Sequence, residues 1–285
     1  MPAMDGSRDT RRSALRFRKM HGLGNDFVVI DQRERAWPLN ADVVRAIGDR
    51  HRGVGFDQLA EIVPGTGGAD ADLVFWNADG STAGACGNAT RCVADLLLAE
   101  RGTASVGLRT ERGLLACSRR QDGLIEVDMG APSLAWDEVP LSQDVDTREL
   151  PIDGAPSACS MGNPHCTFFV EDAEAVDLAR LGPRIEHHPL FPERTNVQVV
   201  EVVSPTRARV RVWERGVGPT LASGSSSCAV VVNAVRRGLM ERAATLTLDG
   251  GEIHIHWRES DGHVLMAGPV AYVFEGVFDP GFVSP

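Results

Sequence analysis

Lysine is almost missing from the chain: Lys19 is the only one in 285 residues, and all other Lys and Arg positions are arginine. Enzymes that use pyridoxal phosphate hold this cofactor as a Schiff base on a lysine, so such an enzyme would have to use Lys19. The lysine content therefore disfavours pyridoxal phosphate, and we expect the protein to work without a cofactor.

The chain also lacks a cysteine framework and long apolar runs. Its six cysteines are too few for a disulfide scaffold, and none of them forms a Cys-x-x-Cys pair of the kind that binds zinc. This usage predicts a reducing, cytoplasmic location. No segment approaches the roughly 18 uninterrupted apolar residues that a membrane helix needs, so we expect no membrane partner.

Positive charge is in deficit, with 39 acidic against 29 basic residues and a net charge of -10. A field of this sign repels phosphate backbones and anionic lipid, so we expect no nucleic-acid partner. The N-terminus is rich in arginine but carries Asp5 and Asp9 and has no apolar core of a secretory signal. We predict that residues 1–15 form a disordered tail.

What is present is the composition of a globular protein, with 43% hydrophobic residues and a length that suggests two domains. Alternating or continuous apolar runs predict strands at residues 27–31, 73–76, 123–128, 165–170, 196–203, 208–213, 245–248 and 252–257. Helical patterns cover residues 40–50, 88–101, 173–181 and 224–237. The chain is therefore expected to be strand-rich with few helices.

Two of the predicted helices share an organisation. Each opens beside a nucleophile-type residue followed by glycine, Cys86-Gly87 and Ser223-Gly224, and each ends at a glycine. Both helices are apolar on nearly all faces, so each is expected at the centre of its own half, wrapped by strands. The pattern indicates a weak internal duplication with two facing helix N-termini.

A proline-rich stretch between Gly130 and Ser157 breaks regular structure and is the best candidate for the passage between the halves. We place an N-terminal domain at residues 16–131, completed by residues 271–285. A C-terminal domain then covers residues 132–270.

Cys86 is the first candidate for chemistry. A helix N-terminus attracts anions such as carboxylates, and its field stabilises a thiolate and lowers the pKa of a cysteine from about 8.5. On position alone, Cys86 fits a small buried residue equally well. The segment NADGSTAGACGNATRCVA at residues 77–94 favours the reactive thiol, because its small and amide residues show no apolar periodicity before the helix begins.

That segment, together with HGLGNDF at 21–27, MGNPH at 161–165 and ERGVGPTLASG at 214–224, resembles the diaminopimelate epimerase family. The motifs are specific and spread over most of the chain. The resemblance implies an α/β (α+β) fold with two pseudo-symmetric domains. Each domain would be a curved, mainly antiparallel sheet or barrel around a central buried helix, with the active site in the cleft between them.

The resemblance also implies an isomerase that needs no cofactor and interconverts LL- and meso-2,6-diaminopimelate for lysine and peptidoglycan precursor synthesis. In the family two cysteines flank the α-carbon: one thiolate removes the α-proton and the opposite thiol delivers a proton to the other face. Two bases are required because a single base tends to return the proton to the face it left.

Matched to the family position by position, the implied catalytic residues are Cys86, Ser223, His165 and Glu214. The implied substrate-binding residues are Asn25, Gln58, Asn77, Gly87, Asn88, Asn163, Asn196, Glu214, Arg215, Gly224 and Ser225. Neutral amides and one guanidinium suit a small-molecule amino-acid substrate with two amino-acid ends. Taken singly, each asparagine fits a turn or cap residue, and Arg215 fits a surface charge.

Ser223 departs from the family, which has its second catalytic cysteine at this position. An alcohol is a far weaker acid than a thiol, so we expect impaired epimerisation. An engineered change, a degenerate paralogue and a natural enzyme with altered chemistry all explain the serine. Two further alternatives are a related racemase or dehydratase acting on another amino acid, and a catalytically inactive amino-acid-binding paralogue.

Metal chemistry has weak support. His254 and His256 alternate along a predicted strand and would share one face, but no third ligand lies at suitable spacing. We therefore expect surface histidines and no metal site. Gly224-Ser-Ser-Ser does not match the nucleophile elbow of serine hydrolases, and the sequence leaves a homodimer open.

Overall fold

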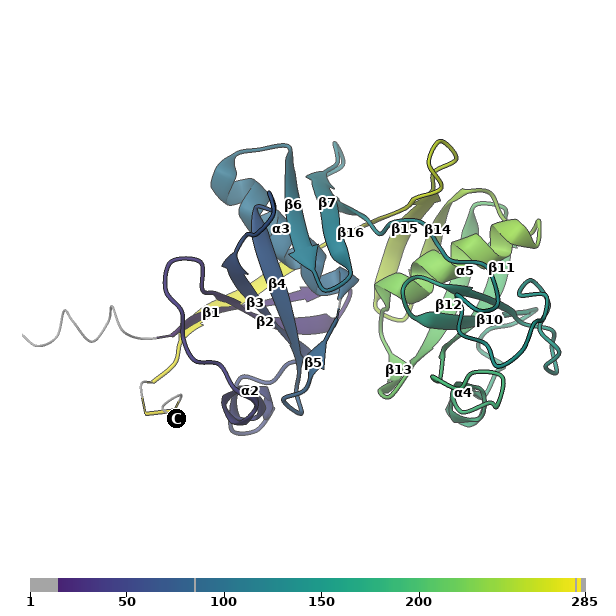
Figure 1. The fold of residues 1–285 in the computed structure, drawn as a ribbon, viewed down its shortest axis with the longest axis horizontal. Coiled ribbons are helices and arrows are strands. Elements are labelled where there is room, and N and C mark those ends of the chain that lie inside the picture. Colours follow the sequence, from purple (N-terminus) through teal and green to yellow (C-terminus); the bar gives the residue numbers. More distant parts are fainter. Residues whose placement is uncertain (1–14, 85, 280, 283–285) are drawn as a thin grey trace, which may run out of the picture.

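The computed structural model describes residues 15–84, 86–279 and 281–282. Within them the chain forms two halves that lie side by side, each with strands around one long helix (Figure 1). The predicted tail lies outside the described residues except at its last position. Leu15 is buried and its carbonyl oxygen accepts a hydrogen bond from the Phe278 NH at 2.9 Å. The tail prediction is therefore wrong at Leu15, because this side chain packs in the core beside Phe278.

The first half contains strands β1 to β8 and two helices. The strands are β1 Arg16–Gly22, β2 Asn25–Asp31, β3 Gln58–Pro64, β4 Ala71–Asn77, β5 Thr82–Ala83, β6 Ser105–Thr110, β7 Gly113–Arg119 and β8 Ile125–Asp128. The helices are α2 Ala41–Gly48 and α3 Gly87–Arg101. Asn40 caps α2 as its position in the sequence predicts, since its side chain accepts from the NH groups of Asp42 and Val43.

The second half contains strands β9 to β16 and two helices. The strands are β9 Ser157–Ser160, β10 Pro164–Val170, β11 Asn196–Ser204, β12 Arg207–Glu214, β13 Gly218–Thr220, β14 Ala243–Leu248, β15 Gly251–Trp257 and β16 Val264–Gly268. The helices are α4 Leu178–Glu186 and α5 Gly224–Arg236. The last strand, β17 Ala271–Val277, returns to the first half and pairs with β1 in antiparallel orientation.

The two halves repeat one strand order. In the first, β2 and β3 are parallel, β3 and β4 are antiparallel, and β4 pairs in parallel with β6 after α3. In the second, β10 and β11 are parallel, β11 and β12 are antiparallel, and β12 pairs in parallel with β14 after α5. The internal duplication and the mixed α/β fold predicted from the sequence are therefore confirmed.

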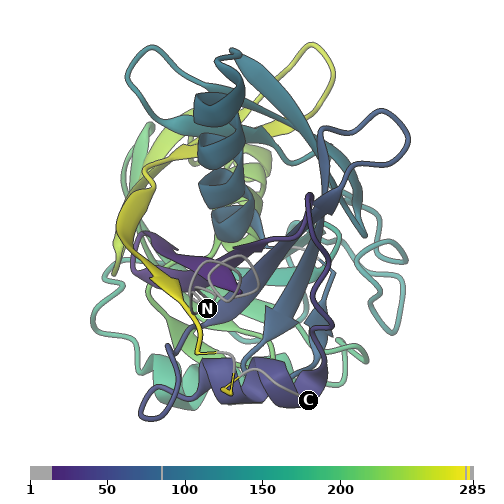
Figure 2. The same cartoon turned by 90° about the vertical axis from the view of Figure 1, so that its left-hand side faces the viewer.

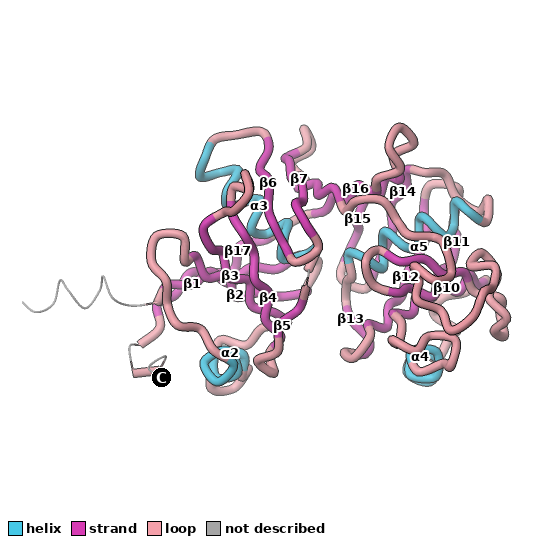
Figure 3. Tube along the Cα trace, in the orientation of Figure 1, coloured by secondary structure: helices cyan, strands magenta, loops and turns pink. Residues whose placement is uncertain are grey.

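The repeated helices occupy equivalent places. α3 runs lengthwise inside the strands of its half (Figure 2), and α5 is buried in the same way in the other half. Both end at a left-handed glycine, with φ of 63° at Gly102 and 69° at Gly238, as the sequence predicts. The shorter helices α2 and α4 lie at the same end of the two halves (Figure 3). Within the described part of the chain no helix combines the length and apolar character required to cross a membrane.

One predicted helix is displaced. The pattern at residues 173–181 predicts a helix there, whereas α4 spans Leu178–Glu186. Asp177 sets the start, because its side chain accepts a hydrogen bond from the Arg180 NH at 3.1 Å. Residues 129–156 contain no helix or strand beyond an isolated bridge between Ser133 and Ser160, in keeping with their prolines.

The halves are joined by strand pairing as well as by the chain. β8 of the first half pairs with β16 of the second in antiparallel orientation, so the strands form one continuous sheet of 17 strands. The β14–β15 turn also packs on the first half, where a Cβ at Gly250 would lie 1.9 Å from the Leu23 carbonyl oxygen. Only glycine fits at this contact between the halves.

We expect Gly250→Ala to lower the free energy of unfolding by about 1–3 kcal/mol, because the added methyl group has to displace backbone. Urea unfolding monitored by tryptophan fluorescence measures the change. Gly107→Ala is the matched control, since its Cβ would meet only side-chain atoms, of Leu114 at 3.3 Å and of Asp70 at 3.9 Å. Equal stability of Gly250→Ala and the wild type would contradict the close contact.

Candidate active site

The two central helices meet at their N-termini. A Cβ placed on Gly224 would lie 3.7 Å from the Cα of Gly87, so the first residues of α5 and α3 are in contact range. The same Cβ would lie 2.8 Å from the Met266 sulfur, and one on Gly87 would lie 2.9 Å from the Met266 methyl carbon. A side chain at either glycine would therefore have to displace the Met266 side chain of β16, which lies at their meeting point.

Cys86 and Ser223 are the residues immediately before the two helices. Cys86 caps α3, its sulfur accepting from the Ala89 NH at 3.5 Å. The Ser223 side chain does not cap α5 and instead donates a hydrogen bond to Glu214 Oε2 at 3.1 Å. Cys86 is partly exposed, whereas Ser223 is buried. Cys86 and Ser223, at equivalent places in the two halves, thus differ from each other in environment as well as in chemistry.

A cavity of about 740 Å³ opens over the two helix starts, with walls from both halves. Most of the site residues predicted from the sequence line it: Asn25, Gln58, Asn77, Cys86, Gly87, Asn88, Asn163, Glu214, Ser223, Gly224 and Ser225. Three predicted residues, His165, Asn196 and Arg215, lie behind the wall and do not line the cavity. The structure thus brings segments from residue 25 to residue 225 to one place.

Amide groups of the first half fix one another along one wall. The Asn88 side-chain NH₂ donates to Asn25 Oδ1 at 3.1 Å, and the Gln58 NH₂ donates to Asn77 Oδ1 at 3.0 Å. The Asn88 NH₂ also approaches the Ala222 carbonyl oxygen at 3.4 Å, which links the two halves beside Ser223. Asn88 Oδ1 is buried and accepts no hydrogen bond within the described part of the chain. That oxygen is available to a donor group on a ligand.

A network of charged residues supports these amides. Asp57 accepts from the Asn25 NH₂ at 2.8 Å and pairs with Arg50, which also pairs with Asp26. Lys19 donates to Asp26 and to a backbone carbonyl oxygen, and is buried. Burial opposes ionisation of Asp26, but hydrogen bonds from Arg50 and Lys19 lower its pKa to about 2. Lys19, the one lysine of the chain, therefore contributes to the structure by binding Asp26.

His165 holds part of the opposite wall. It is fully buried, with Nδ1 3.0 Å from the Gln198 NH₂ and Nε2 3.0 Å from Asn163 Oδ1. Burial and the charges of Arg112 and Arg215 lower the pKa of His165 to about 3. The imidazole is therefore neutral and, because Gln198 donates to Nδ1, it donates to Asn163 from Nε2.

Asn196 and Arg215 form a second support behind that wall. Asn196 Oδ1 accepts from the backbone NH of Arg215 at 3.0 Å, and its NH₂ donates to the Pro164 carbonyl oxygen at 2.9 Å. The Arg215 guanidinium donates from Nη1 to the Glu193 carbonyl oxygen at 3.0 Å. Asn196 thus fixes the turn that carries Arg215.

Burial controls the acid–base properties of the site. It raises the pKa of the Cys86 thiol to about 12, although the Ala89 NH and the Arg91 charge lower it. The expectation that the helix N-terminus brings this pKa below its ordinary value is therefore wrong for this structure, because desolvation outweighs the helix field. Burial also raises the pKa of Glu214, which the hydrogen bond from Ser223 lowers in part.

Arg91 brings a buried positive charge to the same region. Its side chain is fully buried, and its Nη1 donates to the Met266 sulfur at 3.4 Å. Nε and Nη2 have no hydrogen-bond partner among the described residues. The start of α3 therefore carries a charge that nothing in this part of the chain neutralises.

Four charged residues that line the cavity were not predicted from the sequence: Asp26, Arg50, Asp57 and Arg112. Arg112, in the turn between β6 and β7, crosses from the first half and donates from Nη1 to the Met161 carbonyl oxygen at 2.9 Å and to Asn163 Oδ1 at 3.3 Å. Burial and the charge of Arg215 lower its pKa. An arginine in a hairpin turn looks like a surface charge in sequence, so only the fold identifies it.

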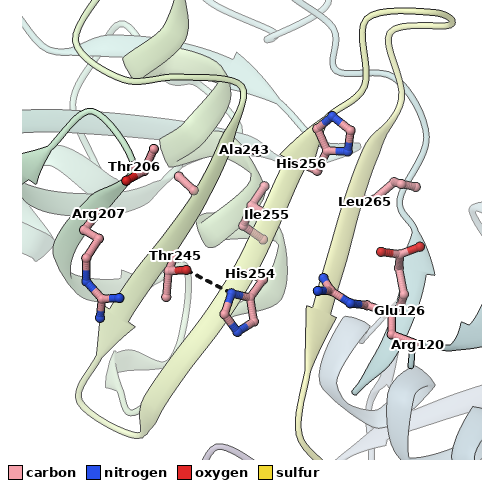
Figure 4. A pocket seen from close by; sticks show the side chains of 11 residues that line it. Arg120, Glu126, Thr206, Arg207, Ala243, Thr245, His254, Ile255, His256 and Leu265 are labelled. Carbon is pink, nitrogen blue, oxygen red and sulfur yellow. Dashed lines mark hydrogen bonds between the residues drawn. The ribbon is translucent and has the colours of Figure 1, made fainter. Parts of the chain in front are cut away.

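A second cavity, of about 400 Å³, lies on strands β14 to β16 and β8, away from the helix starts (Figure 4). His254 and His256 both line it, and His254 Nδ1 lies 2.9 Å from Thr245 Oγ1. No cluster of three or more His, Cys, Asp or Glu side chains that could hold a metal is found in residues 15–84, 86–279 and 281–282.

Comparison with known proteins gives the family. The sequence profile of diaminopimelate epimerase matches residues 17–135 and 157–273. The chain belongs to the diaminopimelate epimerase family. The diaminopimelate epimerase of Acidiphilium cryptum is 50% identical over 278 residues, covering 96% of this chain and 99% of the relative. That of Rhodospirillum centenum is 54% identical over 266 residues, covering 92% and 91%.

Solved structures share the fold at low identity. A phenazine biosynthesis protein of the PhzF family from Bacillus anthracis matches with a TM-score of 0.66 and 15% identity over 93% of this chain and 99% of that protein. A hydroxyproline epimerase from Agrobacterium vitis matches with a TM-score of 0.66 and 15% identity over 94% and 93%. The diaminopimelate epimerase family, to which this isomerase belongs, therefore shares its two-domain architecture with these proteins.

We expect Cys86 to be the first thiol alkylated by limited iodoacetamide treatment, because the other five cysteines are buried. Its labelling rate should rise about tenfold per pH unit across the neutral range, since a pKa near 12 leaves the thiolate fraction far from saturation. Peptide mapping by mass spectrometry measures the order, and Cys86→Ala is the control that removes the fast label. Earlier labelling of Cys92 or Cys228 would contradict the assignment.

The Lys19–Asp26 pair predicts an acid-sensitive contribution to stability. The folded pKa of Asp26, about 2, lies below the ordinary value near 3.9, so this contribution is present above about pH 5 and is lost as pH falls toward 2. We expect Asp26→Asn to lower the free energy of unfolding at pH 7 by about 1–3 kcal/mol, because Lys19 loses its carboxylate, and to flatten the decline below pH 5.

Urea unfolding between pH 7 and pH 2 measures both effects. Asp122→Asn is the matched control, since Asp122 forms an exposed pair with Arg120 and should contribute little. Declines of equal steepness in Asp26→Asn and the wild type would show that another group causes the acid sensitivity.

Proposed function

We propose that the chain binds diaminopimelate in the cavity between its halves and interconverts the LL and meso forms by proton transfer at one α-carbon, slowly because of Ser223. The observation that carries this proposal is the meeting of two helix N-termini, with Cys86 before one and Ser223 before the other. The names of the relatives supply the substrate and the reaction.

The helix starts suit the carboxylate at the reacting end of the substrate. Unpaired NH groups at Gly87 and Asn88 of α3 and at Gly224 and Ser225 of α5 can donate to it from both halves, and each helix end adds partial positive charge. These contacts stabilise negative charge that develops when the α-proton leaves. We propose that the amides of Asn25, Gln58 and Asn77 orient the remainder of the substrate.

The proton steps follow from the two residues before the helices. The Cys86 thiolate takes the α-proton, the electron pair stays on the α-carbon and its carboxylate, and a proton delivered from the Ser223 side completes the inversion. Because the pKa of Cys86 is high, its thiol has to release its proton to solvent as the substrate binds, and the cationic α-ammonium group of the substrate favours the thiolate that remains.

Ser223 makes the second step slow. Its hydroxyl donates to Glu214, whose pKa burial raises. After the hydroxyl proton has passed to the α-carbon, Glu214 in its protonated form can transfer its own proton to the serine oxygen and become a carboxylate. In the reverse direction serine cannot replace a thiolate as the base, because the pKa of its hydroxyl is so far above that of a thiol that almost no alkoxide is present. We assign His165 a positioning role: neutral and buried, it holds Asn163 toward the cavity.

Three further properties belong to this proposal. The domain division at residues 131 and 132, with β17 completing the first domain, is supported by the pairing of β17 with β1.

A homodimer is supported by exposed apolar side chains on β17, namely Tyr272, Val273 and Phe274, since β17 pairs only with β1 among the described strands. A cytoplasmic location is supported by the lack of disulfides among the six cysteines.

We expect Ser223→Cys to raise the epimerisation rate by about 10² to 10⁴-fold, because a thiol restores the second acid–base group. Circular dichroism or chiral chromatography of LL-diaminopimelate over time measures the rate. Ser223→Ala is the matched control and should be slower than the wild type if the hydroxyl donates the proton. An unchanged rate in Ser223→Cys would mean that the two-base assignment is wrong.

The wild-type chain should also exchange one α-proton without inverting the centre. In D₂O, Cys86 can remove and return the proton of the diastereomer that presents it to that face, so deuterium should enter one diastereomer faster than inversion occurs. Mass spectrometry measures the incorporation, and Cys86→Ala should abolish it. Binding of diaminopimelate with neither exchange nor turnover would instead identify an inactive binding paralogue.

A further inference from the structure

Two arginines approach the same end of the cavity from opposite halves. Arg112 lies in the β6–β7 turn and lines the cavity, and Arg215 follows β12 directly behind the wall. Their charges are close enough that Arg215 lowers the pKa of Arg112. Neither guanidinium forms an ion pair with an Asp or Glu of the described residues, although many other arginines of the chain do.

The position of Arg112 is fixed by the half opposite its own. Its Nη1 is bound to Met161 and Asn163 of the second half, at 2.9 Å and 3.3 Å. Gly162 makes room for it, because a Cβ there would lie 2.9 Å from Nη1, and the φ of +83° at Gly162 also favours glycine. Nε and Nη2 of Arg112 make no hydrogen bond to the described residues. The guanidinium is thus held in place with donors left over.

Asn163 and His165, the side chains next to Arg112 at this end of the cavity, carry no negative charge. His165 is neutral, and Asn163 uses its oxygen for both His165 and Arg112. The Asn163 NH₂ makes no hydrogen bond within the described residues, although Asn163 lines the cavity. Two cations without an ion-pair partner among the described residues, beside unused NH donors, create a site complementary to a carboxylate.

We infer that Arg112 is a specificity-determining residue, a second guanidinium that binds the carboxylate at the non-reacting end of the substrate together with Asn163. The inference rests on the proposed function, which places the reacting carboxylate at the helix starts. A guanidinium has paired NH donors that match the two oxygens of a carboxylate, whereas a lysine ammonium has no such pair. Arg112 therefore selects substrates with two carboxylates, and it joins the substrate to both halves at once.

Diaminopimelate and L-lysine test this selection, because they differ only in the carboxylate at the non-reacting end. Isothermal titration calorimetry on the whole chain gives the affinity for each. We expect Arg112→Met to weaken diaminopimelate binding by about 10- to 100-fold, the range of one charged hydrogen-bonded contact, and to leave lysine binding within threefold. Arg112→Lys should fall between the wild type and Arg112→Met.

Arg120→Met is the matched control, since Arg120 pairs with exposed Asp122 and lies outside this cavity. Its affinity for both ligands should equal that of the wild type. Thermal unfolding of each variant shows whether it is folded. If Arg112→Met does not fold, Arg112→Lys still tests the inference.

The outcomes separate the inference from the proposed function. A wild-type chain that does not bind diaminopimelate overturns the proposed function itself. If the wild type prefers diaminopimelate to lysine and Arg112→Met keeps that preference, the proposed function stands and the inference is wrong. Equal loss of both ligands in Arg112→Met also overturns the inference, because it identifies Arg112 as a structural support of the wall.

Discussion

The meeting of two helix N-termini at Gly87 and Gly224 is the constraint on which the rest of the structure depends. Each helix start carries about half a positive charge, so the two repel when brought into contact range. Arg91 adds a charge that no acidic side chain of the described residues pairs with, and two of its nitrogens, Nε and Nη2, have no hydrogen-bond partner there. The sheets that enclose α3 and α5 hold these groups together, and a carboxylate bound between the helix starts would relieve the repulsion.

In the proposed function, this concentration of positive charge is what would allow a poor acid such as Cys86 to take part in proton transfer. Desolvation alone keeps the thiol protonated, with a pKa of about 12. The helix field and Arg91 oppose that effect, so the free energy of forming a thiolate depends on what else occupies the cavity. At the other helix, Ser223 turns toward Glu214 and uses its proton in a hydrogen bond, which leaves the two sides of the site chemically unequal.

Much of this arrangement could be predicted from the sequence. Period-two runs predicted strands such as β11 and β15, and the paired patterns at Cys86 and Ser223 predicted the duplication, because local periodicity and glycine position are properties of short segments. The start of α4 was displaced because the cap at Asp177 was not recognised. Arg112 was missed because its role depends on Met161 and Gly162, about fifty residues away, which only the fold brings to it.

The pairing of β8 with β16 affects how the molecule can move. The chain passes between the halves twice, once through residues 129–156 and once between β16 and β17, and the paired strands lie at the junction. A protease that cuts the first connection would leave the halves attached. The width of the cleft is therefore constrained by a hydrogen-bonded pair of strands at the junction as well as by the two chain connections.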